Sequence, residues 1–420
     1  MKIFKFGGAS VNNVDRIRQL ADILRLYPDD KKMVVISAMG KTTNALEKVV
    51  KAFFDGRKEE ALQLFEHIKK QHLNTAKYLL VTSANATDAR LLDFFTEVEW
   101  ALHDKPVKDF DYYYDQIVCV GELFSSTIIS AYLNEQGINN IWTDVRDIFR
   151  TDDHFRNAGI DREQTEKNIR DKVVPFFDEY DIVVTPGFIG ATDENESTTL
   201  GREGSDYSAA VFGNLLGAED VTIWKDVAGI MNADPKIFPA AVVMPELSYD
   251  ELIEMAYYGA QVIHPKTIKP LENKNIPLVV KCFIDPALPG TVIHHKTIKN
   301  LPPVFVIKQN QALLHLHSRD FSFIGEHAVS RLYHLLAQKN ITPNLIQTDA
   351  VTLMVCIDDM EDEIGQLAAA ASEIFDVQVE KGLSLLTIRH YTEETAAEMT
   401  AGKYIVLKQQ SPHTVQFLLR

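Results

Sequence analysis

The chain has 420 residues, too many for one ordinary hydrophobic core, so its length predicts two or three domains. Hydrophobic residues make up 46% of the chain, enough for packed interiors, and the formal net charge of −16 argues against nucleic acid as a partner. There is no bilayer-length apolar run and no signal-peptide core at the start, so we expect a cytoplasmic protein without a membrane partner. The three cysteines are scattered and predict no metal site.

Strand, glycine turn and helix follow one another twice within about the first fifty residues. Residues 3–6 predict a strand, Gly7-Gly8 ends it, and a helix follows with apolar residues at helical spacing. Residues 33–37 predict a second strand, with another helix from about Thr43. This alternation is typical of a parallel α/β sheet sandwiched by helices.

Further along this half, the pattern is less regular. The stretch 191–204 is polar and punctuated by glycine, so we expect a surface loop there. Ser205 or Asp206 would then cap the helix that follows, which should end at Gly217. A strand over 276–280 would close this half of the chain.

Around residue 300 the predicted elements become short and regular, in the β-α-β-β-α-β order of a ferredoxin-like module. A further strand (383–389), a short helix (392–400) and two strands up to residue 419 resemble a second copy that is cut short. We therefore expect a catalytic domain over residues 1–298 and a regulatory region over 299–420.

The first candidate site is Lys5-Phe6-Gly7-Gly8. Paired glycines after a strand let backbone N–H groups approach an anion, and Lys5 can point its ammonium at the same anion. Residues 37–44 repeat the arrangement of strand, glycine and hydroxyl-rich helix start, and helix N-termini attract anions. A Walker A motif is excluded there, because the position that needs a glycine holds Val35.

The segment 199–207 places Arg202 between Gly201 and Gly204. A guanidinium fixed in this way suits a carboxylate as a two-pronged partner. A surface loop with a helix cap would explain Ser205 and Asp206, but it would not explain the arginine.

A fourth segment, 224–236, begins with Lys225-Asp226 at a predicted strand end and carries a second cation, Lys236. Ligands of parallel α/β sheets bind beyond the carboxyl ends of the strands. Four sites of this kind therefore predict one crevice, in which several cations hold a polyphosphate and Arg202 with Glu122 holds an amino acid.

Five segments, in this order, resemble aspartate kinase: residues 5–10, 40–44, 200–207, 224–235 and 258–265. The resemblance runs from residue 1 to about 295. It implies an amino-acid-kinase-type, mainly parallel sheet, followed by the ferredoxin-like ACT modules with which that family senses end-product amino acids.

The same resemblance implies roles for individual residues. Lys5 and Asp206 would be catalytic, and Asp206 would orient the lysine or the substrate ammonium. Four residues would hold the substrate: Thr43, Glu122, Arg202 and Ser205. The ATP site would consist of Lys5, Gly7, Gly8, Lys225, Asp226, Met231, Lys236, Gln261 and Val262. Four positions depart from the common pattern: Ala9 stands for a threonine, Glu203 for a glycine or small residue, Lys236 for an arginine and Gln261 for a lysine.

The implied reaction is ATP-dependent phosphorylation of the side-chain carboxylate of L-aspartate, giving 4-phospho-L-aspartate and ADP. It is the first step of lysine, threonine and methionine biosynthesis, and Mg²⁺ would be carried with ATP. One alternative is a kinase for another acidic amino acid such as glutamate. The other is a non-catalytic amino-acid sensor, although the presence of Lys5, Arg202 and Asp206 counts against a degenerate site.

By the same resemblance, lysine or threonine would be a feedback effector of the C-terminal region. Ser318 and Asp320 lie in the expected effector loop, and Asn344 stands where lysine-sensing members often have an aspartate. Such modules usually pair between subunits, so we expect a homodimer or a higher homo-oligomer; a purely structural dimerisation domain is the alternative. We also expect a single-activity kinase, without a dehydrogenase domain.

Overall fold

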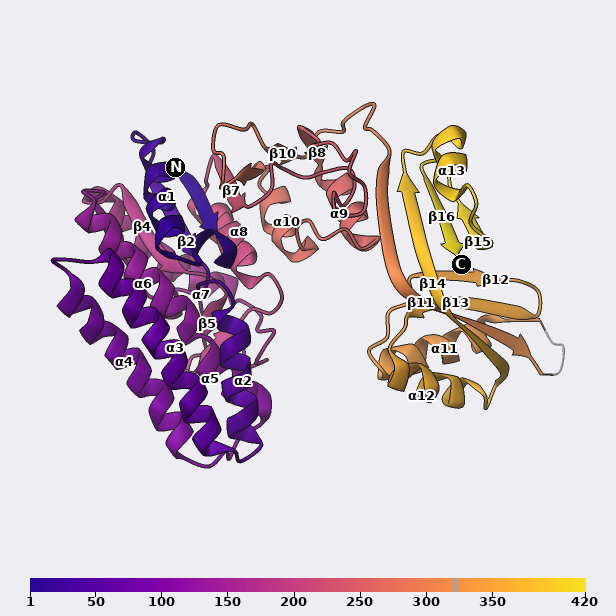
Figure 1. The fold of residues 1–420 in the computed structure, drawn as a ribbon, viewed down its shortest axis with the longest axis horizontal. Coiled ribbons are helices and arrows are strands. Elements are labelled where there is room, and N and C mark those ends of the chain that lie inside the picture. The colour runs from indigo at the N-terminus through magenta and orange to yellow at the C-terminus, as the bar shows by residue number, and fades with distance from the viewer. Residues whose placement is uncertain (320–322) are drawn as a thin grey trace. The chain divides into compact units, whose positions relative to one another are not determined.

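The structure is a computed structural model of the chain that describes residues 1–319 and 323–420. The chain folds into two compact units, and it crosses between them several times (Figure 1). Unit 1 comprises Met1–Ile230, Val243–Ile253 and Val262–Ile298, and unit 2 comprises Met231–Val242, Glu254–Gln261 and Lys299–Arg420.

Unit 1 is built on an eight-stranded sheet with the strand order β3-β4-β2-β1-β7-β9-β10-β8. All neighbours pair in parallel except β9 and β10, which confirms the predicted mainly parallel sheet. The strands are β1 (Lys2–Phe6), β2 (Lys32–Ile36), β3 (Asn140–Trp142), β4 (Ile182–Pro186), β7 (Asp220–Lys225), β8 (Glu246–Ser248), β9 (Leu278–Cys282) and β10 (Thr291–His294).

The centre of this sheet is β1, whose Lys5 lies opposite Val35 of β2 and Ile223 of β7. The three strands therefore end at one level, and their carboxyl ends form one edge of the sheet. The core at this point is aromatic: the rings of Phe6 and Trp224 stack with centroids 6.0 Å apart, and both side chains are fully buried.

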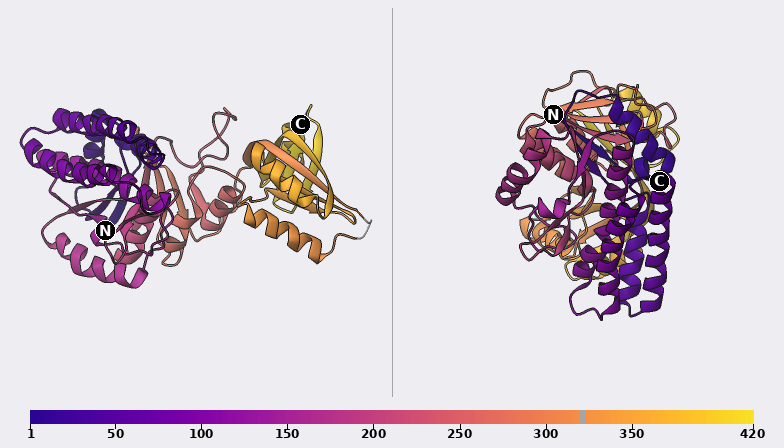
Figure 2. Two further views of the ribbon diagram at one scale, coloured as in Figure 1. Left: turned by 90° about the horizontal axis from the view of Figure 1, so that it is seen from below. Right: turned by 90° about the vertical axis from the view of Figure 1, so that its left-hand side faces the viewer.

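Helices flank the sheet, and α2, α3 and α4 pack against one another in succession (Figures 1 and 2). Helix α6 contacts β2, β3 and β4, whereas α8 contacts β1, β2 and β7. The helices of this part of the chain are α1 (Val14–Arg25), α2 (Thr42–Phe54), α3 (Lys58–Leu79), α4 (Ala84–His103), α5 (Phe110–Val118), α6 (Val120–Glu135), α7 (Arg162–Asn168), α8 (Gly204–Leu216), α9 (Tyr249–Tyr257) and α10 (Pro265–Glu272).

One helical stretch of the described residues, Phe110–Glu135, is long and apolar enough to cross a membrane. However, 89% of its most apolar window is buried inside the protein. Core helices that never meet a membrane satisfy the same criterion, so this stretch is weak evidence for a membrane span.

The prediction of a surface loop over 191–204 is wrong. This segment contributes to the two-stranded antiparallel ribbon of β5 (Ile189–Ala191) and β6 (Ser197–Thr199), and the side chains of β6 are buried. Polar composition suggested exposure, but the hydroxyl groups of this ribbon find partners inside the protein; Thr198, for example, bonds to Thr151 at 2.7 Å.

The predicted cap of α8 is also wrong. The helix begins at Gly204, and its N-cap is Glu203 in a left-handed conformation with φ 52° and no side-chain cap bond. Ser205 and Asp206 lie within the first turn, so their side chains are available to the site rather than to the helix end. The predicted end of the helix at Gly217 is confirmed, with φ 63° at that glycine.

Unit 2 contains a six-stranded antiparallel sheet with the strand order β12-β13-β11-β14-β16-β15. Its first elements follow the predicted β-α-β-β-α-β order. The strands are β11 (Val304–Ser318), β12 (Leu345–Thr348), β13 (Thr352–Asp358), β14 (Phe375–Arg389), β15 (Ile405–Gln410) and β16 (Thr414–Leu419), and the helices are α11 (Glu326–Gln338), α12 (Glu361–Ala371) and α13 (Glu393–Thr400).

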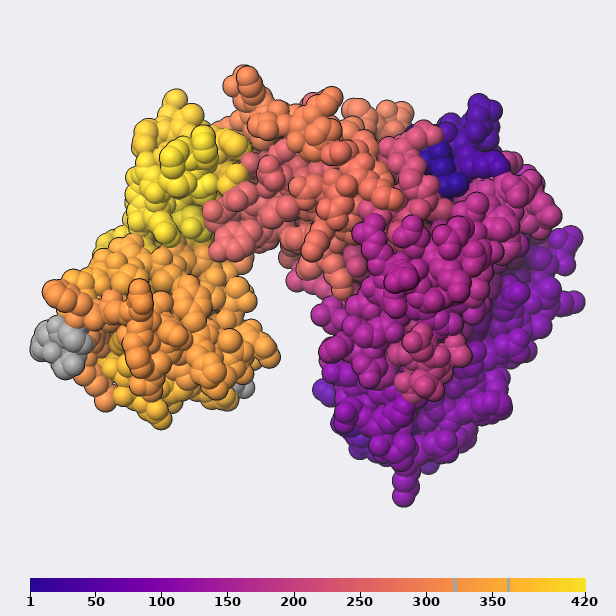
Figure 3. Space-filling view, turned by 180° about the vertical axis from the view of Figure 1, so that it is seen from behind, coloured from indigo at the N-terminus to yellow at the C-terminus, as the bar shows by residue number. Residues whose placement is uncertain are grey.

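The two predicted strands 375–379 and 383–389 form one long strand, β14, which pairs with the equally long β11. Gly382, whose φ is 73°, lies at a pairing irregularity between the pairs Gln311–Leu383 and Leu313–Glu380, and Asn310, which precedes Gln311, has a φ of 53°. The long strands join a first part of unit 2, orange in Figure 3, to a second part that ends in yellow. A buried cluster that includes Leu314, Leu332 and Leu353 forms the core of the first part.

Candidate active site

A buried ion pair lies at the carboxyl end of β1. Lys5 Nζ lies 2.6 Å from Asp206 Oδ1, and the two side chains are only 11% and 3% exposed. Burial alone would raise the pKa of Asp206, but the positive charges of Lys5 and Lys225 hold it below its usual value. Asp206 is therefore ionised near neutral pH and fixes the ammonium of Lys5 in the crevice.

Two glycine turns meet directly beyond this lysine. A Cβ on Gly8 would lie 2.8 Å from the backbone oxygen of Ala38 and 2.9 Å from that of Gly40, so no larger residue fits there. The N–H of Gly40 donates to the oxygen of Gly8 at 3.0 Å. The backbone after β1 and the backbone after β2 thus form one continuous surface, where the sequence predicted an anion site and a helix start. Gly7 lies beside Lys5 Nζ on this surface.

Glu122 lies in the first turn of α6 and is 4% exposed. Burial raises its pKa to about 8, although the charge of Lys5 and a hydrogen bond from the Ala38 backbone lower it in part. Its Oε2 atom has no hydrogen-bond partner among the described residues. A buried carboxyl group with one unpartnered oxygen is prepared for a cationic ligand, because a nearby cation favours its ionised form.

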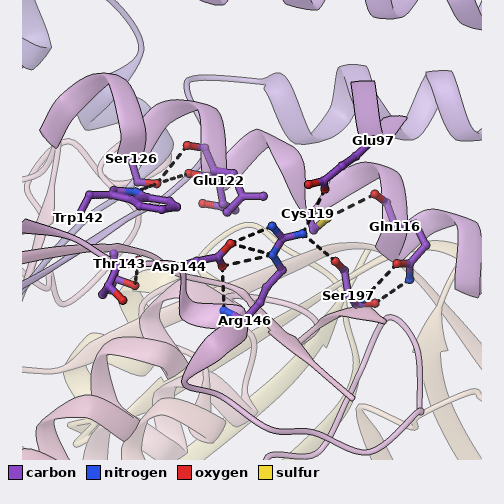
Figure 4. A network of polar contacts seen from close by, with 12 residues as sticks. Glu97, Gln116, Cys119, Glu122, Ser126, Trp142, Thr143, Asp144, Arg146 and Ser197 are labelled. Atoms are coloured by element: carbon purple, nitrogen blue, oxygen red, sulfur yellow. Dashed lines mark hydrogen bonds and ion pairs between the residues drawn. The ribbon is translucent and has the colours of Figure 1, made fainter. Parts of the chain in front are cut away.

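The first turn of α6 is held in place from two sides. Gly121 packs on α2, where a Cβ would lie 3.2 Å from Thr42 Cγ2, and this brings the start of α2, with Thr43, to the start of α6. On the other side, Trp142 Nε1 donates to Ser126 Oγ at 3.0 Å, and Ser126 Oγ donates to the oxygen of Glu122 at 2.8 Å (Figure 4).

Arg146, which follows β3, bonds to side chains from several elements near the first turn of α6. Arg146 donates from Nε and Nη2 to the carboxylate of Asp144 at 3.0 and 2.8 Å (Figure 4). Its Nη1 donates to Ser197 Oγ at 3.2 Å and contacts Glu97 of α4 at 3.4 Å. The segment after β3 is thereby tied to β6, which leads into the loop that carries Arg202.

Arg202 itself is exposed, and no carboxylate of the described residues pairs with it, which leaves its guanidinium available to a ligand. The neighbouring Glu203 has a positive φ, which explains why a glycine or small residue is frequent at this position. Its Oε2 accepts a hydrogen bond from the N–H of His264 at 2.7 Å, which compensates the backbone strain. Ser205 is 7% exposed in the first turn of α8.

Sequence reasoning missed Asp115 of α5, which is fully buried. Its Oδ2 accepts the N–H groups of Thr199 at 2.7 Å and Arg156 at 3.0 Å, and its Oδ1 accepts the hydroxyl of Thr199 at 2.7 Å. Burial raises its pKa to about 6 despite these bonds. Asp115 and Glu122 are seven positions apart on adjoining helices. This spacing was the only feature of the sequence that could have indicated Asp115.

The predicted nucleotide-binding residues divide between the two units. In unit 1, Lys225 at the end of β7 donates to the backbone oxygen of Val262 at 2.6 Å, and Asp226 beside it is exposed. Met231, Lys236 and Gln261 belong to unit 2. Asp234 stabilises a turn, because its Oδ1 accepts the N–H of Lys236 at 2.9 Å.

Comparison with known proteins decides the family. The model of the amino acid kinase family matches residues 1–282. Lysine-sensitive aspartokinase 3 of Escherichia coli is 33% identical over 402 residues, covering 92% of this chain and 86% of the relative. The chain belongs to the amino acid kinase family and, within it, to the aspartokinases. Aspartokinase 1 of Arabidopsis thaliana is 30% identical over 92% of this chain and 70% of that protein.

Solved aspartokinase structures share the fold. Escherichia coli aspartokinase III in complex with aspartate and ADP superposes with a TM-score of 0.83 at 28% identity, covering 100% of this chain and 96% of that one. The same enzyme in complex with lysine and aspartate gives the same score and covers 95% of that chain. The aspartokinase from Clostridium acetobutylicum, at 18% identity and a TM-score of 0.80, shows the same fold.

The predicted effector residues of this aspartokinase lie in unit 2. Asp320 is outside the described residues. The N–H of Ser318, at the end of β11, donates to the oxygen of Val351, whereas the N–H of Asn344 donates to that of Cys356. Val351 and Cys356, which accept these two bonds, are five positions apart in extended chain, or roughly 16 Å at 3.3 Å per residue. A single chain therefore does not bring Ser318 and Asn344 together.

Proposed function

We propose that the chain transfers the terminal phosphate of ATP to the side-chain carboxylate of L-aspartate, with Lys5 and Asp206 as its catalytic pair. The observation that carries this assignment is the position of Lys5, which lies beside the buried carboxylate of Asp206 and is close enough to Glu122 to lower the pKa of that carboxyl group. A charged lysine fixed in this way can stabilise the negative charge of a phosphoryl group in transfer.

The charge balance of the site favours a substrate with an ammonium group. Lys5 and Asp206 neutralise each other, and Glu122 with a pKa of about 8 is mostly protonated at pH 7. The ammonium of an amino acid would stabilise the ionised form of Glu122 and supply a partner for its Oε2 atom. Arg202 would bind a carboxylate of the same substrate, and Thr43 and Ser205 would add hydroxyl groups.

The nucleophile would be the side-chain carboxylate of aspartate, which is already ionised near pH 7, so no general base is required. The chain has to bring this anion to the phosphate and to offset the repulsion between them. The described residues include no group of three side chains suited to a metal ion. By the family resemblance, Mg²⁺ would be carried with ATP.

The phosphates of ATP would lie against Gly7 and Gly8. A larger residue at Gly8 would collide with the backbone oxygens of Ala38 and Gly40. Lys225, Asp226 and Val262 would line the nucleotide pocket. The family resemblance also assigns Met231, Lys236 and Gln261 to nucleotide binding, and that assignment stays a prediction. Gln261 provides no cation where a lysine is common, so its contact would be a neutral hydrogen bond.

We further propose that residues 299–420 form a regulatory region of one ACT module and a shortened second one, in a cytoplasmic enzyme. A relative is named lysine-sensitive, and the solved Escherichia coli enzyme binds lysine. Lysine or threonine would be the effector here. Ser318 lies at the end of β11, whereas Asn344 lies near the middle of that strand, where its side chain bonds to Gln311. A ligand that contacts both Ser318 and Asn344 would have to bind between two copies, which supports a homodimer or a higher homo-oligomer.

Trapping of the acyl phosphate tests the reaction. ATP, Mg²⁺, the protein and hydroxylamine are incubated with aspartate or glutamate, and the hydroxamate is measured. Product with aspartate alone is the expected result. Product with glutamate alone would replace the proposal by that of another acidic amino-acid kinase, and product with neither would favour a non-catalytic sensor.

A further inference from the structure

Unit 1 has a second pocket, on the side of α8 that faces α10. Its volume is about 480 Å³, which is within the range of roughly 300–1,000 Å³ typical of small-molecule sites. Apolar side chains form much of its lining: Ile160 before α7, Val211 and Leu215 of α8, and Pro270 of α10. Tyr207 adds the face of an aromatic ring.

The charges around this pocket are all positive. Arg162, Lys266 and Lys269 are among the eleven residues that line it, and none of the eleven is a carboxylate. In a chain with a formal net charge of −16, such a local excess of cations is unusual and matches an anionic ligand. Arg162 is oriented by Asn214, whose Oδ1 accepts from Nη2 at 2.9 Å.

We propose that this pocket binds a small carboxylic acid with an apolar body, such as an aromatic or branched aliphatic acid. The body would lie on Val211, Leu215 and Pro270 beside the ring of Tyr207, and the carboxylate would face Lys266 and Lys269. A polyphosphate would fit less well, because much of the lining is hydrocarbon and would leave several phosphate oxygens without donors.

Lys266 connects the pocket to the loop that carries Arg202. Its Nζ donates to the backbone oxygen of Leu200 at 3.0 Å and to Asn157 Oδ1 at 3.3 Å, and it lies 4.8 Å from the ring centroid of Tyr207. A ligand carboxylate would compete with these acceptors for the ammonium. Since Leu200 is two residues before Arg202, and Tyr207 follows Asp206, occupancy would change the KM for aspartate more than that for ATP.

Binding is tested with 4-fluorophenylacetate, followed by fluorine NMR, and with 4-fluorophenethylamine, which has the same ring and the opposite charge. The acid should bind and the amine should not. Lys269→Gln should weaken binding of the acid about five- to tenfold, since about 1.4 kcal/mol corresponds to tenfold. Lys167→Gln is the matched control, because Lys167 is an exposed cation of α7 outside the pocket.

Val211→Trp should fill the pocket and abolish binding, and circular dichroism would check that this variant folds. Equal binding of acid and amine, or binding unchanged in both Lys269→Gln and Val211→Trp, would overturn the proposal. A dimer that Val211→Trp dissociates would overturn it too, since the pocket would then be an interface between copies.

The link to catalysis rests on the proposed function, whereas the binding measurement does not. Saturating acid should change the aspartate KM at least twofold and leave the ATP KM within error. An inactive wild-type protein that binds the acid would contradict the proposed function alone. An active protein that fails to bind it would contradict this inference alone, and binding without a change in KM would remove the coupling through Lys266.

Discussion

The proposed chemistry depends on Lys5 more than on any other residue. Because Lys5 forms a buried ion pair with Asp206, a substitution of Lys5 also affects the stability of the protein. Removing the lysine would leave a buried carboxylate with less compensation, and breaking such a pair typically costs about 3–5 kcal/mol of stability. A loss of activity in a single variant could therefore reflect unfolding. The double variant Lys5→Met/Asp206→Asn removes both charges and restores electrical balance in the core.

We expect Lys5→Met to lower turnover by roughly 10²- to 10³-fold, the usual effect of losing one group that stabilises a transition state. The double variant should regain most of the thermal stability and none of the activity. Turnover is measured by hydroxamate formation and stability by thermal unfolding. Near-normal turnover in Lys5→Met would contradict the catalytic role of the lysine.

Glu122 predicts a specific pH dependence. A substrate ammonium binds best to the ionised carboxylate, whose population rises as the pH approaches the pKa of about 8. The KM for aspartate should therefore fall, by up to about tenfold per pH unit, between pH 6.5 and pH 8. Glu122→Gln should have a higher KM without this slope, and its KM for ATP should be nearly unchanged. A slope that persists in the variant would assign the titration to another group.

Individual residues also show where sequence reasoning stops. The anion site at Lys5 and Gly8 could be predicted because both stand in a short strand and glycine motif. The role of Asp206 was implied by the family resemblance alone, since its ion pair with Lys5 joins residues that are distant in the sequence. The geometry of Asp115 could not be predicted, because its three donors come from residues 156 and 199, which are distant in the sequence. The role of Glu203 as the left-handed N-cap of α8 also depends on a tertiary bond, to His264.

At the scale of elements, Asp115 joins α5 to the ribbon and to the loop before residue 160. The backbone N–H of Ala158 also donates to the backbone oxygen of Thr199 at 3.0 Å. This bond and the carboxylate of Asp115 together hold the loop before residue 160 against β6, the strand that leads to Arg202. We call the hydrogen bonds of Asp115 the clamp. Because Glu122 lies on α6, the helix that follows α5, the clamp sets the distance between Glu122 and Arg202, the two residues proposed to bind the amino acid.

Asp115→Leu should therefore raise the KM for aspartate about tenfold, with a smaller change in the KM for ATP. Asp115→Asn should be milder, because its amide oxygen can still accept from the N–H groups of Thr199 and Arg156. Asp111→Asn is the control, since this exposed neighbour pairs with the side chain of Arg156 and not with the N–H groups that Asp115 holds. Equal increases in both KM values would indicate general loosening of the fold instead of a clamp on the substrate loop.

Elements with a clear hydrophobic period were predictable, and those defined by polar packing were not. The apolar segments β1, β2 and β4 are strands and the amphipathic segment α1 is a helix, as their hydrophobic patterns predict. The ribbon of β5 and β6 is polar yet buried, so its burial depends on partners that the local sequence does not contain. The strand β10, which has four residues, was not predicted.

For the whole molecule, the change in pattern near residue 300 indicated a second folding unit. It did not show that residues 231–242 and 254–261 group with that unit, since this depends on contacts across the chain. Each unit nevertheless has its own buried core. Leu20 is fully buried in unit 1, and Leu353 is fully buried in the cluster of unit 2.

Separate cores predict separate unfolding transitions, because cooperative unfolding follows shared packing. Leu353→Ala should remove about 2–5 kcal/mol from unit 2 and lower the midpoint of one calorimetric transition by several degrees. Leu20→Ala should lower only the other. ADP with Mg²⁺ should stabilise the unit that holds its phosphates against Gly7 and Gly8, which is unit 1, so it should raise chiefly the transition that responds to Leu20→Ala. If either variant shifts both transitions equally, the two units unfold as one, and binding in unit 1 would be coupled to the stability of unit 2.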